Sequence, residues 1–257
     1  MYRNRIENTA VSGEHALALK RVLLDYHDFQ KQTAPGTLEI QLKALTIWQS
    51  ERLRDTHADL YQTETFRAGL DFLFDELYGA RDFSARDRDL ERIFPKLVKW
   101  LPDKILATVS TLVELNLLTQ RLDKQLAETL LQNVNGQRTD NVITTQNYVE
   151  AYACCQNKAA REKQLQLTQA AGAQLEKHAG SAIIRYSLKL AQAPAEKAGL
   201  AALHAFLVRG FDAFHNMRDI DILIPSLIDR ESAIMVNMFN REPKPFYWPE
   251  SESRSTL

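Results

Sequence analysis

The longest stretch without proline in this chain separates Pro102 from Pro194. Proline inside a helix removes a backbone hydrogen bond and clashes with the preceding turn, so a long stretch without it favours helices. The same stretch is rich in Leu, Ala, Gln, Glu and Lys, which are strong helix formers. The whole chain has only 9 Gly and 8 Pro in 257 residues, fewer than a turn-rich β protein contains. We therefore predict an all-α fold.

Apolar residues recur at three- and four-residue steps, which is the period of one helical face, and they define about eight or nine helices. The expected ranges are 14–32, 37–61, 63–79, 84–98, 103–131, 144–177, 182–191, 195–217 and 220–238, the last interrupted at Pro225. The range 144–177 is polar, so we expect it at the periphery. Residues 1–240 are predicted to form a single compact multi-helix bundle, and residues 241–257 a flexible or surface-docked tail.

Charge and cysteine usage narrow the class of protein. The formal net charge of −1 gives no general attraction to nucleic acid or to anionic membranes, so we expect neither as a partner. The two cysteines, Cys154 and Cys155, are neighbours and cannot form a disulfide framework, which suits a reducing compartment. The first residues lack the apolar core of a secretory signal, and no apolar run approaches the ~18 residues of a membrane span. We predict a cytoplasmic protein.

The helix expected over 63–79 is apolar on most of its circumference, which is typical of a helix packed on several sides. Its apolar positions are Phe66, Leu70, Phe72, Leu73, Phe74, Leu77 and Tyr78. Glu76 falls inside the same arc, where a carboxylate must be either paired or protonated. A buried ion pair is our main interpretation of Glu76, and a catalytic or ligand-binding acid is the alternative.

A second apolar stripe runs along the helix expected over 195–217. It consists of Leu200, Leu203, Leu207, Phe211 and Phe214, and the polar residues on or beside it are His204, His215 and Arg218. Gly69 and Gly210 lie on the apolar faces of the two helices, although glycine costs about 1 kcal/mol relative to alanine inside a helix. We expect the two helices to cross near these glycines and to form the dry centre of the fold.

The segment from Phe72 to Tyr78 reads Phe-Leu-Phe-Asp-Glu-Leu-Tyr and resembles the heptapeptide of the bacterial FFLEELY motif proteins. Four positions match as written, namely Phe72, Glu76, Leu77 and Tyr78, and the other three are exchanges of similar character. The resemblance covers roughly residues 20–110, with a second similar element over 206–218. It implies a compact helical protein and no particular activity. The candidate functional core around the motif is Phe72, Glu76, Tyr78, Asp82, Arg86 and Asp87.

Signatures of common enzyme classes are missing from the sequence. It has no Gly-rich phosphate loop, no His-Glu-x-x-His, no Cys-x-x-Cys and no Gly-x-Ser-x-Gly. A metal-bearing helical bundle is the best enzyme alternative, but it needs two acid-x-x-His steps, and the chain has one, from Asp212 to His215. A small hydrophobic ligand held between helices is a further alternative, given the many Phe residues.

Two remaining segments favour contacts with other proteins. Residues 81–92 alternate in charge, which predicts a solvated face or the rim of an interface. The tail places three consecutive aromatic residues between prolines, and exposed aromatics tend to be docked, on the chain itself or on a partner. We predict a non-enzymatic regulatory or scaffolding protein that contacts another protein or a second copy of itself as a homodimer. We expect no catalytic residue, metal ligand or cofactor; the alternative is a metal- or hydrophobic-ligand-binding bundle with redox activity.

Overall fold

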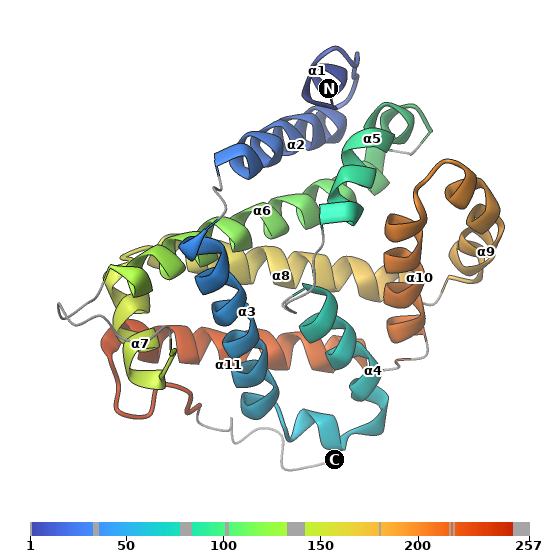
Figure 1. Cartoon of the computed structure of the whole chain (residues 1–257). Helices are drawn as coiled ribbons and strands as arrows, with labels where there is room; N and C mark the ends of the chain where they lie inside the picture. The colour runs from blue at the N-terminus through green and yellow to red at the C-terminus, as the bar shows by residue number, and fades with distance from the viewer. Residues whose placement is uncertain are drawn as a thin grey trace.

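The computed structural model describes residues 2–32, 36–77, 84–100, 103–132, 142–179, 181–215, 217 and 219–248. Over these residues the chain is all-helical, as the sequence predicts, with eleven α-helices and no strand (Figure 1). None of the helices in these ranges combines the length and the apolar character that crossing a membrane requires.

The helices follow one another with short connections. They are α1 (Tyr2–Glu7), α2 (Glu14–Gln32), α3 (Thr37–Thr56), α4 (Glu64–Phe72), α5 (Ser84–Trp100), α6 (Asp103–Leu131), α7 (Thr145–Cys154), α8 (Lys158–Ala179), α9 (Ala182–Lys197), α10 (Ala201–His215) and α11 (Ile220–Asn240). A 3₁₀ turn precedes α4 and a π-helical turn, Leu73–Leu77, continues it.

The expected number of eight or nine helices is wrong for two reasons. The N-terminal residues form α1, which has no apolar period long enough to be seen in the sequence. The range 144–177 is broken into α7 and α8, because Gln156 adopts a left-handed backbone with φ 51° and Asn157 starts the second helix. Asn is a favoured N-cap residue, so this break had a weak signal in the sequence. Pro225, by contrast, does not interrupt α11.

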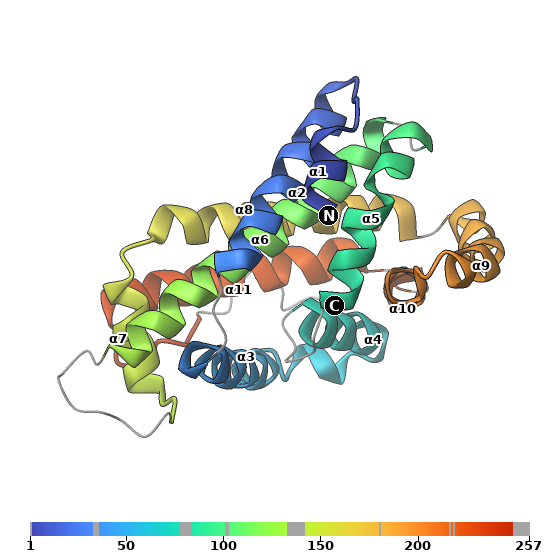
Figure 2. The ribbon, with the colours of Figure 1, turned by 45° about the horizontal axis from the view of Figure 1, so that its top comes forward.

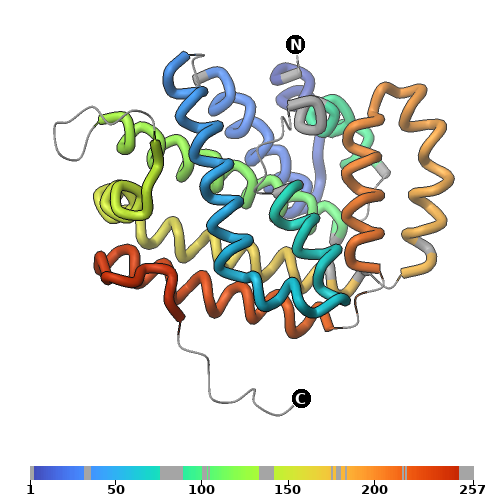
Figure 3. The backbone as a smooth tube through the Cα atoms, turned by 60° about the horizontal axis from the view of Figure 1, so that its bottom comes forward, coloured from blue at the N-terminus to red at the C-terminus, as the bar shows by residue number. Residues whose placement is uncertain are grey.

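Four long helices lie in succession, each packed on the next, in the order α2, α6, α8 and α11 (Figures 1 and 2). The helix α3 packs across α6 and is tied to α11 by side-chain contacts. At one end of the molecule α7 packs against α6 and α11, and at the other end α4, α5 and α10 come together with α9 outermost (Figure 3).

The range expected at the periphery is instead part of the interior. Tyr148 and Tyr152 of α7 are buried in an apolar cluster with α3, α6 and α11. On α8, Leu167, Ala171 and Gly172 are buried between α6 and α11. The polar composition of α8 suggested an exposed helix, but some of its polar residues are buried and hydrogen-bonded. Gln164, for example, donates to the hydroxyl of Thr119 and accepts from Arg161.

The predicted crossing of two helices at glycine is confirmed. A Cβ on Gly69 of α4 would collide with Met217 and would lie 3.0 Å from the Phe214 ring. A Cβ on Gly210 of α10 would lie 2.8 Å from the Phe72 ring of α4. The prediction that both helices form the dry centre is only half right. Phe66, Gly69 and Leu70 of α4 are buried, as are Leu73 and Phe74 of the π-helical turn that continues it. The longer α10 buries only Gly210 and Phe214, because its other faces look toward α9 and solvent.

A buried ion cluster joins α3 to α11. Glu231 accepts a hydrogen bond from Arg52 at 2.5 Å and lies 2.9 Å from Nε2 of His57. His57 has a fully buried side chain, and those of Arg52 and Glu231 are 10% and 19% exposed. Burial alone would raise the pKa of Glu231, but the Arg52 charge and the hydrogen bond with His57 outweigh burial and lower this pKa to about 2. Glu231 is therefore ionised in the folded protein over the ordinary pH range.

The C-terminal segment after α11 lies on the chain itself as far as the structure describes it, which is to Trp248. Phe246 packs against Trp48 with ring centroids 6.0 Å apart, and the Arg230 guanidinium lies 4.3 Å from the Trp248 ring centroid. Asn237 donates to the carbonyl oxygens of Pro245 and Tyr247. The last nine residues lie outside the described residues.

Gly172→Ala should destabilise the protein by about 1–3 kcal/mol, even though alanine is the better helix former. The added Cβ would lie 2.5 Å from Cγ2 and 3.2 Å from Cβ of Ile224, so the backbones of α8 and α11 must separate. Urea unfolding gives the change in the free energy of unfolding. Gln169→Ala is the control, since Gln169 is an exposed residue one turn earlier on the same helix, and it should change that free energy by less than about 0.5 kcal/mol. Equal stability of the two variants would contradict the close packing of α8 on α11.

Glu231→Gln should lower the free energy of unfolding by about 3 kcal/mol at neutral pH, because it leaves the Arg52 charge buried without its partner. The folded-state pKa of Glu231, about 2, is below its ordinary value of 4.5, so its stabilisation is present above pH 4.5 and is lost as pH falls toward 2. The difference between wild type and variant should therefore shrink over this range in urea titrations. Glu128→Gln removes only an exposed pair with Lys124 and should cost well under 1 kcal/mol.

Candidate interaction surface on the α9–α10 hairpin

Phe72, which begins the predicted motif core, lies at the C-terminal end of α4 and joins this helix to α10. Its ring centroid is 5.5 Å from that of Phe206 and 5.8 Å from that of Phe214, the latter in an edge-on arrangement. The same ring covers Gly210. Phe72 is therefore a packing residue between two helices, and nothing around it indicates chemistry.

The other predicted motif residues fall outside what the structure describes. Tyr78 and Asp82 lie outside the described residues, as do the side chains of Glu76, Arg86 and Asp87. Arg218, predicted as a polar residue beside the second apolar stripe, also lies outside them. The ion pair expected for Glu76 therefore stays a prediction. The buried ion cluster that the structure does show is formed by Arg52, His57 and Glu231, none of which stood out in the sequence.

His204 and His215, the two candidate polar residues of α10, both contact α9. Nε2 of His204 lies 2.8 Å from the carbonyl oxygen of Leu188, and since a carbonyl only accepts, this nitrogen donates. The His215 ring stacks on Phe211 at a centroid distance of 4.8 Å, and its Nε2 lies 3.4 Å from a guanidinium nitrogen of Arg185. Both histidines, which the sequence placed on or beside the apolar stripe of α10, are half-buried and lie between α10 and α9.

The turn between α9 and α10 is built from backbone hydrogen bonds around Gly199. This residue has φ +65°, a left-handed conformation that favours glycine. The Gly199 N–H donates to the carbonyl of Glu196, and the Leu200 N–H donates to the carbonyl of Ala195 at 2.7 Å. Together these two bonds form the Schellman motif that ends a helix and reverses the chain. The hairpin therefore has a defined geometry at its closed end.

Two charged residues of α5 contact the closed end of this hairpin, where α9 turns into α10. Asp89 accepts from the backbone N–H of Leu203 at 3.4 Å in the first turn of α10, and Arg92 donates to the carbonyl of Gly199. Asp89 is buried, and so is Glu91, which lies 3.1 Å from the ring of His27. The expectation that this charged stretch is a solvated face is therefore wrong for its last turn, where the charges pair with backbone and side-chain groups of other helices.

The outer face of α9 carries exposed apolar side chains. Tyr186 and Leu190, one helical turn apart, are 64% and 59% exposed, and Leu207 of α10 is 45% exposed. Only α10 makes extensive contact with α9 among the described elements, and α9 lies at the edge of the molecule (Figure 2). We call Tyr186, Leu190 and Ala193 the outer face of α9. An amphipathic helix normally buries its apolar residues, so this face is a candidate interaction surface, and none of the described elements covers it.

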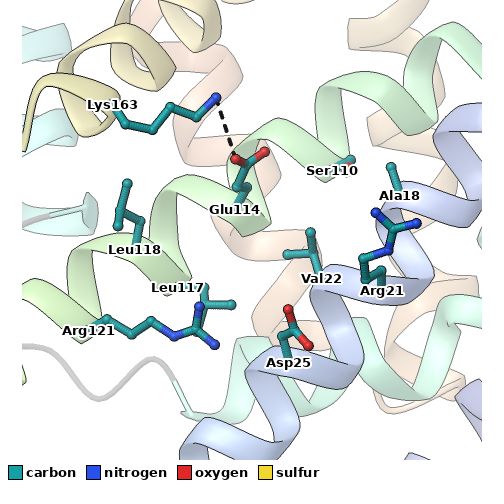
Figure 4. Close-up of a pocket in the computed structure, with 10 residues that line it drawn as sticks. All are labelled: Ala18, Arg21, Val22, Asp25, Ser110, Glu114, Leu117, Leu118, Arg121 and Lys163. Carbon is teal, nitrogen blue, oxygen red and sulfur yellow. Dashed lines mark ion pairs between the residues drawn. The ribbon is translucent and has the colours of Figure 1, made fainter. Parts of the chain in front are cut away.

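A groove lies between α2 and α8, with α6 as its floor (Figure 4). Its volume is about 390 Å³, and it is lined by Ala18, Arg21, Val22, Asp25, Ser110, Glu114, Leu117, Leu118, Arg121 and Lys163. Lys163 and Glu114 form an ion pair at 3.6 Å across it. Five of its ten lining residues carry a charge, of both signs, so this groove differs from the mostly apolar pocket that a small hydrophobic ligand prefers.

The cysteines and the possible metal ligands that the structure describes show no sign of a reactive site. Cys155 is buried, and Cys154 is exposed beside Glu150 and Arg241. Burial and the Glu150 carboxylate raise the pKa of the Cys154 thiol, which makes it less reactive. Within the described residues, no three His, Cys, Asp or Glu side chains are placed to hold a metal ion. Nothing in this part of the chain favours the metal-binding alternative.

Comparison with known proteins places the chain in a family. A family model described as a domain of unknown function, DUF8198, matches residues 28–245. The chain belongs to this family. The matched range includes α3 to α11, so the hairpin and the ion cluster both lie inside the DUF8198 domain. No curated protein and no solved structure matches the chain. This match does not test the resemblance to FFLEELY motif proteins, which stays a prediction.

His204→Ala should loosen α9 more than it weakens the whole DUF8198 domain. A neutral hydrogen bond is worth about 1 kcal/mol, so amide exchange in α9 should become about fivefold faster. Hydrogen–deuterium exchange measured by peptide should show this change in α9 and little change in α11. His15→Ala is the control, because His15 lies on α2 and has only a long contact of 3.9 Å with Asp103. Unchanged exchange in α9 would show that His204 does not hold the hairpin.

Proposed function

We propose that the protein is a non-enzymatic regulatory or scaffolding protein that binds a protein partner through the outer face of α9. The observation that supports this proposal is the exposure of Tyr186 and Leu190 on a helix that is packed on one side only. Large apolar side chains in contact with water cost about 1.5–3 kcal/mol each relative to burial. A partner that covers such a surface removes these side chains from water, which lowers the free energy and favours binding.

The arrangement fits a known way of recognising proteins. A helix that presents apolar residues three and four positions apart can lie in a groove or against another helix, with these residues as anchors. Tyr is enriched among the residues that contribute most to binding energy, because it buries a large area with few rotatable bonds. The Schellman turn and the contacts from His204, Asp89 and Arg92 hold the helix in place before binding. A preorganised helix loses less conformational entropy on binding.

Location in the cytoplasm is a part of the same proposal. Its support is chemical: both cysteines are free thiols, one exposed and one buried, and thiols stay reduced in that compartment. The alternative of a metal- or hydrophobic-ligand-binding bundle has no comparable support, since the described groove between α2 and α8 is charged. The proposal therefore rests on the apolar face and on no assigned catalytic residue.

A photo-crosslinking amino acid at position 190 should form covalent products with a protein partner in cells that produce the chain. The matched control is the same amino acid at position 40, because Ile40 of α3 is 62% exposed, close to the 59% of Leu190, and lies on a different part of the molecule. We expect several-fold more crosslinked product from position 190, read by gel mobility and mass spectrometry. Equal yields from the two positions, or none from position 190, would refute the proposal.

A further inference from the structure

We infer that the partner of the outer face of α9 is a second copy of this chain, bound as an antiparallel pair of α9 helices around a twofold axis at Leu190. This inference rests on the proposed function, because it names the occupant of the same face. Leu190 lies next to the midpoint of Ala182–Lys197, so an axis there brings almost the full length of one helix over the other. A twofold axis also lets one surface bind itself, which is the commonest arrangement of homodimers.

The apolar residues of the face are complementary to themselves in this arrangement. In an antiparallel pair centred near Leu190, a residue before Leu190 on one helix lies opposite the residue about equally far after Leu190 on the other helix. The numbers of two facing residues therefore add up to about 380. Leu190 then meets Leu190 of the other copy, and the large Tyr186 meets the small Ala193 and the flat Pro194. Large residues opposite small ones allow two helices to approach closely, as the ridges of one enter the grooves of the other.

Charges along one edge of the helix favour the antiparallel direction. Arg185, Lys189, Gln192 and Glu196 recur at three- and four-residue steps beside the apolar face. Antiparallel helices bring the same edge of each copy together in reverse order, so Arg185 lies opposite Glu196 twice, once on each side of the axis. Lys189 lies opposite the uncharged Gln192. A parallel pair would instead bring this edge beside the opposite edge of the other helix, which carries the uncharged Ser187 and Ala191, so Arg185 and Glu196 would meet no opposite charge.

Arg185 and Glu196 form no ion pair with any residue that the structure describes. Glu196 accepts from the Gln192 amide at 3.2 Å, and a guanidinium nitrogen of Arg185 lies 3.4 Å from Nε2 of His215. Both side chains are exposed. A second copy supplies an opposite charge to each of them, without breaking an ion pair between described residues.

The size of the face sets the expected strength of the dimer. A helix of 16 residues is about 24 Å long, and one face of it is smaller than the ~800 Å² per partner of a standard interface. We therefore expect a reversible dimer with a dissociation constant in the micromolar range, measurable by sedimentation equilibrium of the full chain up to several hundred micromolar.

Charge reversal tests both the partner and the direction. Arg185→Glu alone places two pairs of carboxylates in contact, and Glu196→Arg alone places two pairs of guanidinium groups in contact, so each variant should associate with itself at least about tenfold more weakly than wild type. An equal mixture of the two variants restores both attractive pairs and should form a heterodimer with an affinity near that of wild type. The double variant should also regain self-association. Arg21→Glu and Glu51→Arg change the net charge equally at exposed positions elsewhere and should leave the dissociation constant unchanged.

Several outcomes would overturn the inference. A wild-type chain that stays monomeric at all concentrations would show that the partner is not a second copy. Single reversals without effect, or a mixture that does not recover, would show that the helices do not pair in this direction. If position 190 crosslinks to a different protein while the chain is monomeric, the proposed function stands and the inference fails. Both reversed residues are exposed, and the contact that Arg185 makes with His215 is a long one of 3.4 Å, so each variant should melt close to wild type, which circular dichroism checks.

Discussion

Glu231 accepts hydrogen bonds from two residues of a segment more than 170 positions earlier in the chain, Arg52 and His57. The two helices that this ion cluster joins each run through both of the larger apolar clusters. On α3, Leu45 belongs to one cluster and Leu53 to the other, and α11 passes from Leu227 to Ile234 in the same way. Sliding α3 along α11 by one turn would separate the charges inside the protein, at a cost of several kcal/mol. The ion cluster therefore fixes the register on which both halves of the core depend.

Much of the fold follows from the sequence, because local signals decide where helices begin and end. The predicted ranges 14–32 and 103–131 coincide with α2 and α6, and the crossing at Gly69 and Gly210 was visible as glycine on apolar faces. What hydropathy cannot show is which polar side chains find partners. Asp123 accepts from Gln49 inside the protein, and burial raises the pKa of Asp123 despite the nearby Arg161. Such residues read as surface residues until the neighbouring helices are known.

The same holds for the candidate surface: the sequence pattern predicts which residues share a helix face, but it does not predict which helix packs on that face. A stripe of apolar residues marked α10, and His204 and His215 were marked as polar residues beside it, yet no sequence pattern tells which helix lies next to them. In the structure the neighbouring helix is α9, which contacts His204 through the carbonyl of Leu188 and His215 through Arg185. The sequence did not predict the exposed outer face of α9, because apolar residues such as Tyr186 and Leu190 resemble core residues when their exposure is unknown. A four-residue spacing predicts that two residues share a face and leaves open whether that face is covered.

Polar groups are usually exposed and large apolar side chains usually buried, and this protein departs from both tendencies. Some of its polar groups are buried, and some of its large apolar side chains are exposed. The interior between α3, α6, α7, α8 and α11 holds charged and polar groups such as Arg52 and Gln164, while the outer face of α9 exposes Tyr186 and Leu190. A buried polar group is stable only when its hydrogen bonds are made within the chain, and an exposed apolar face is relieved only from outside it. The buried polar groups therefore serve the fold, whereas α9, which among the described elements packs extensively on α10 alone, exposes the apolar residues that the proposed partner would cover.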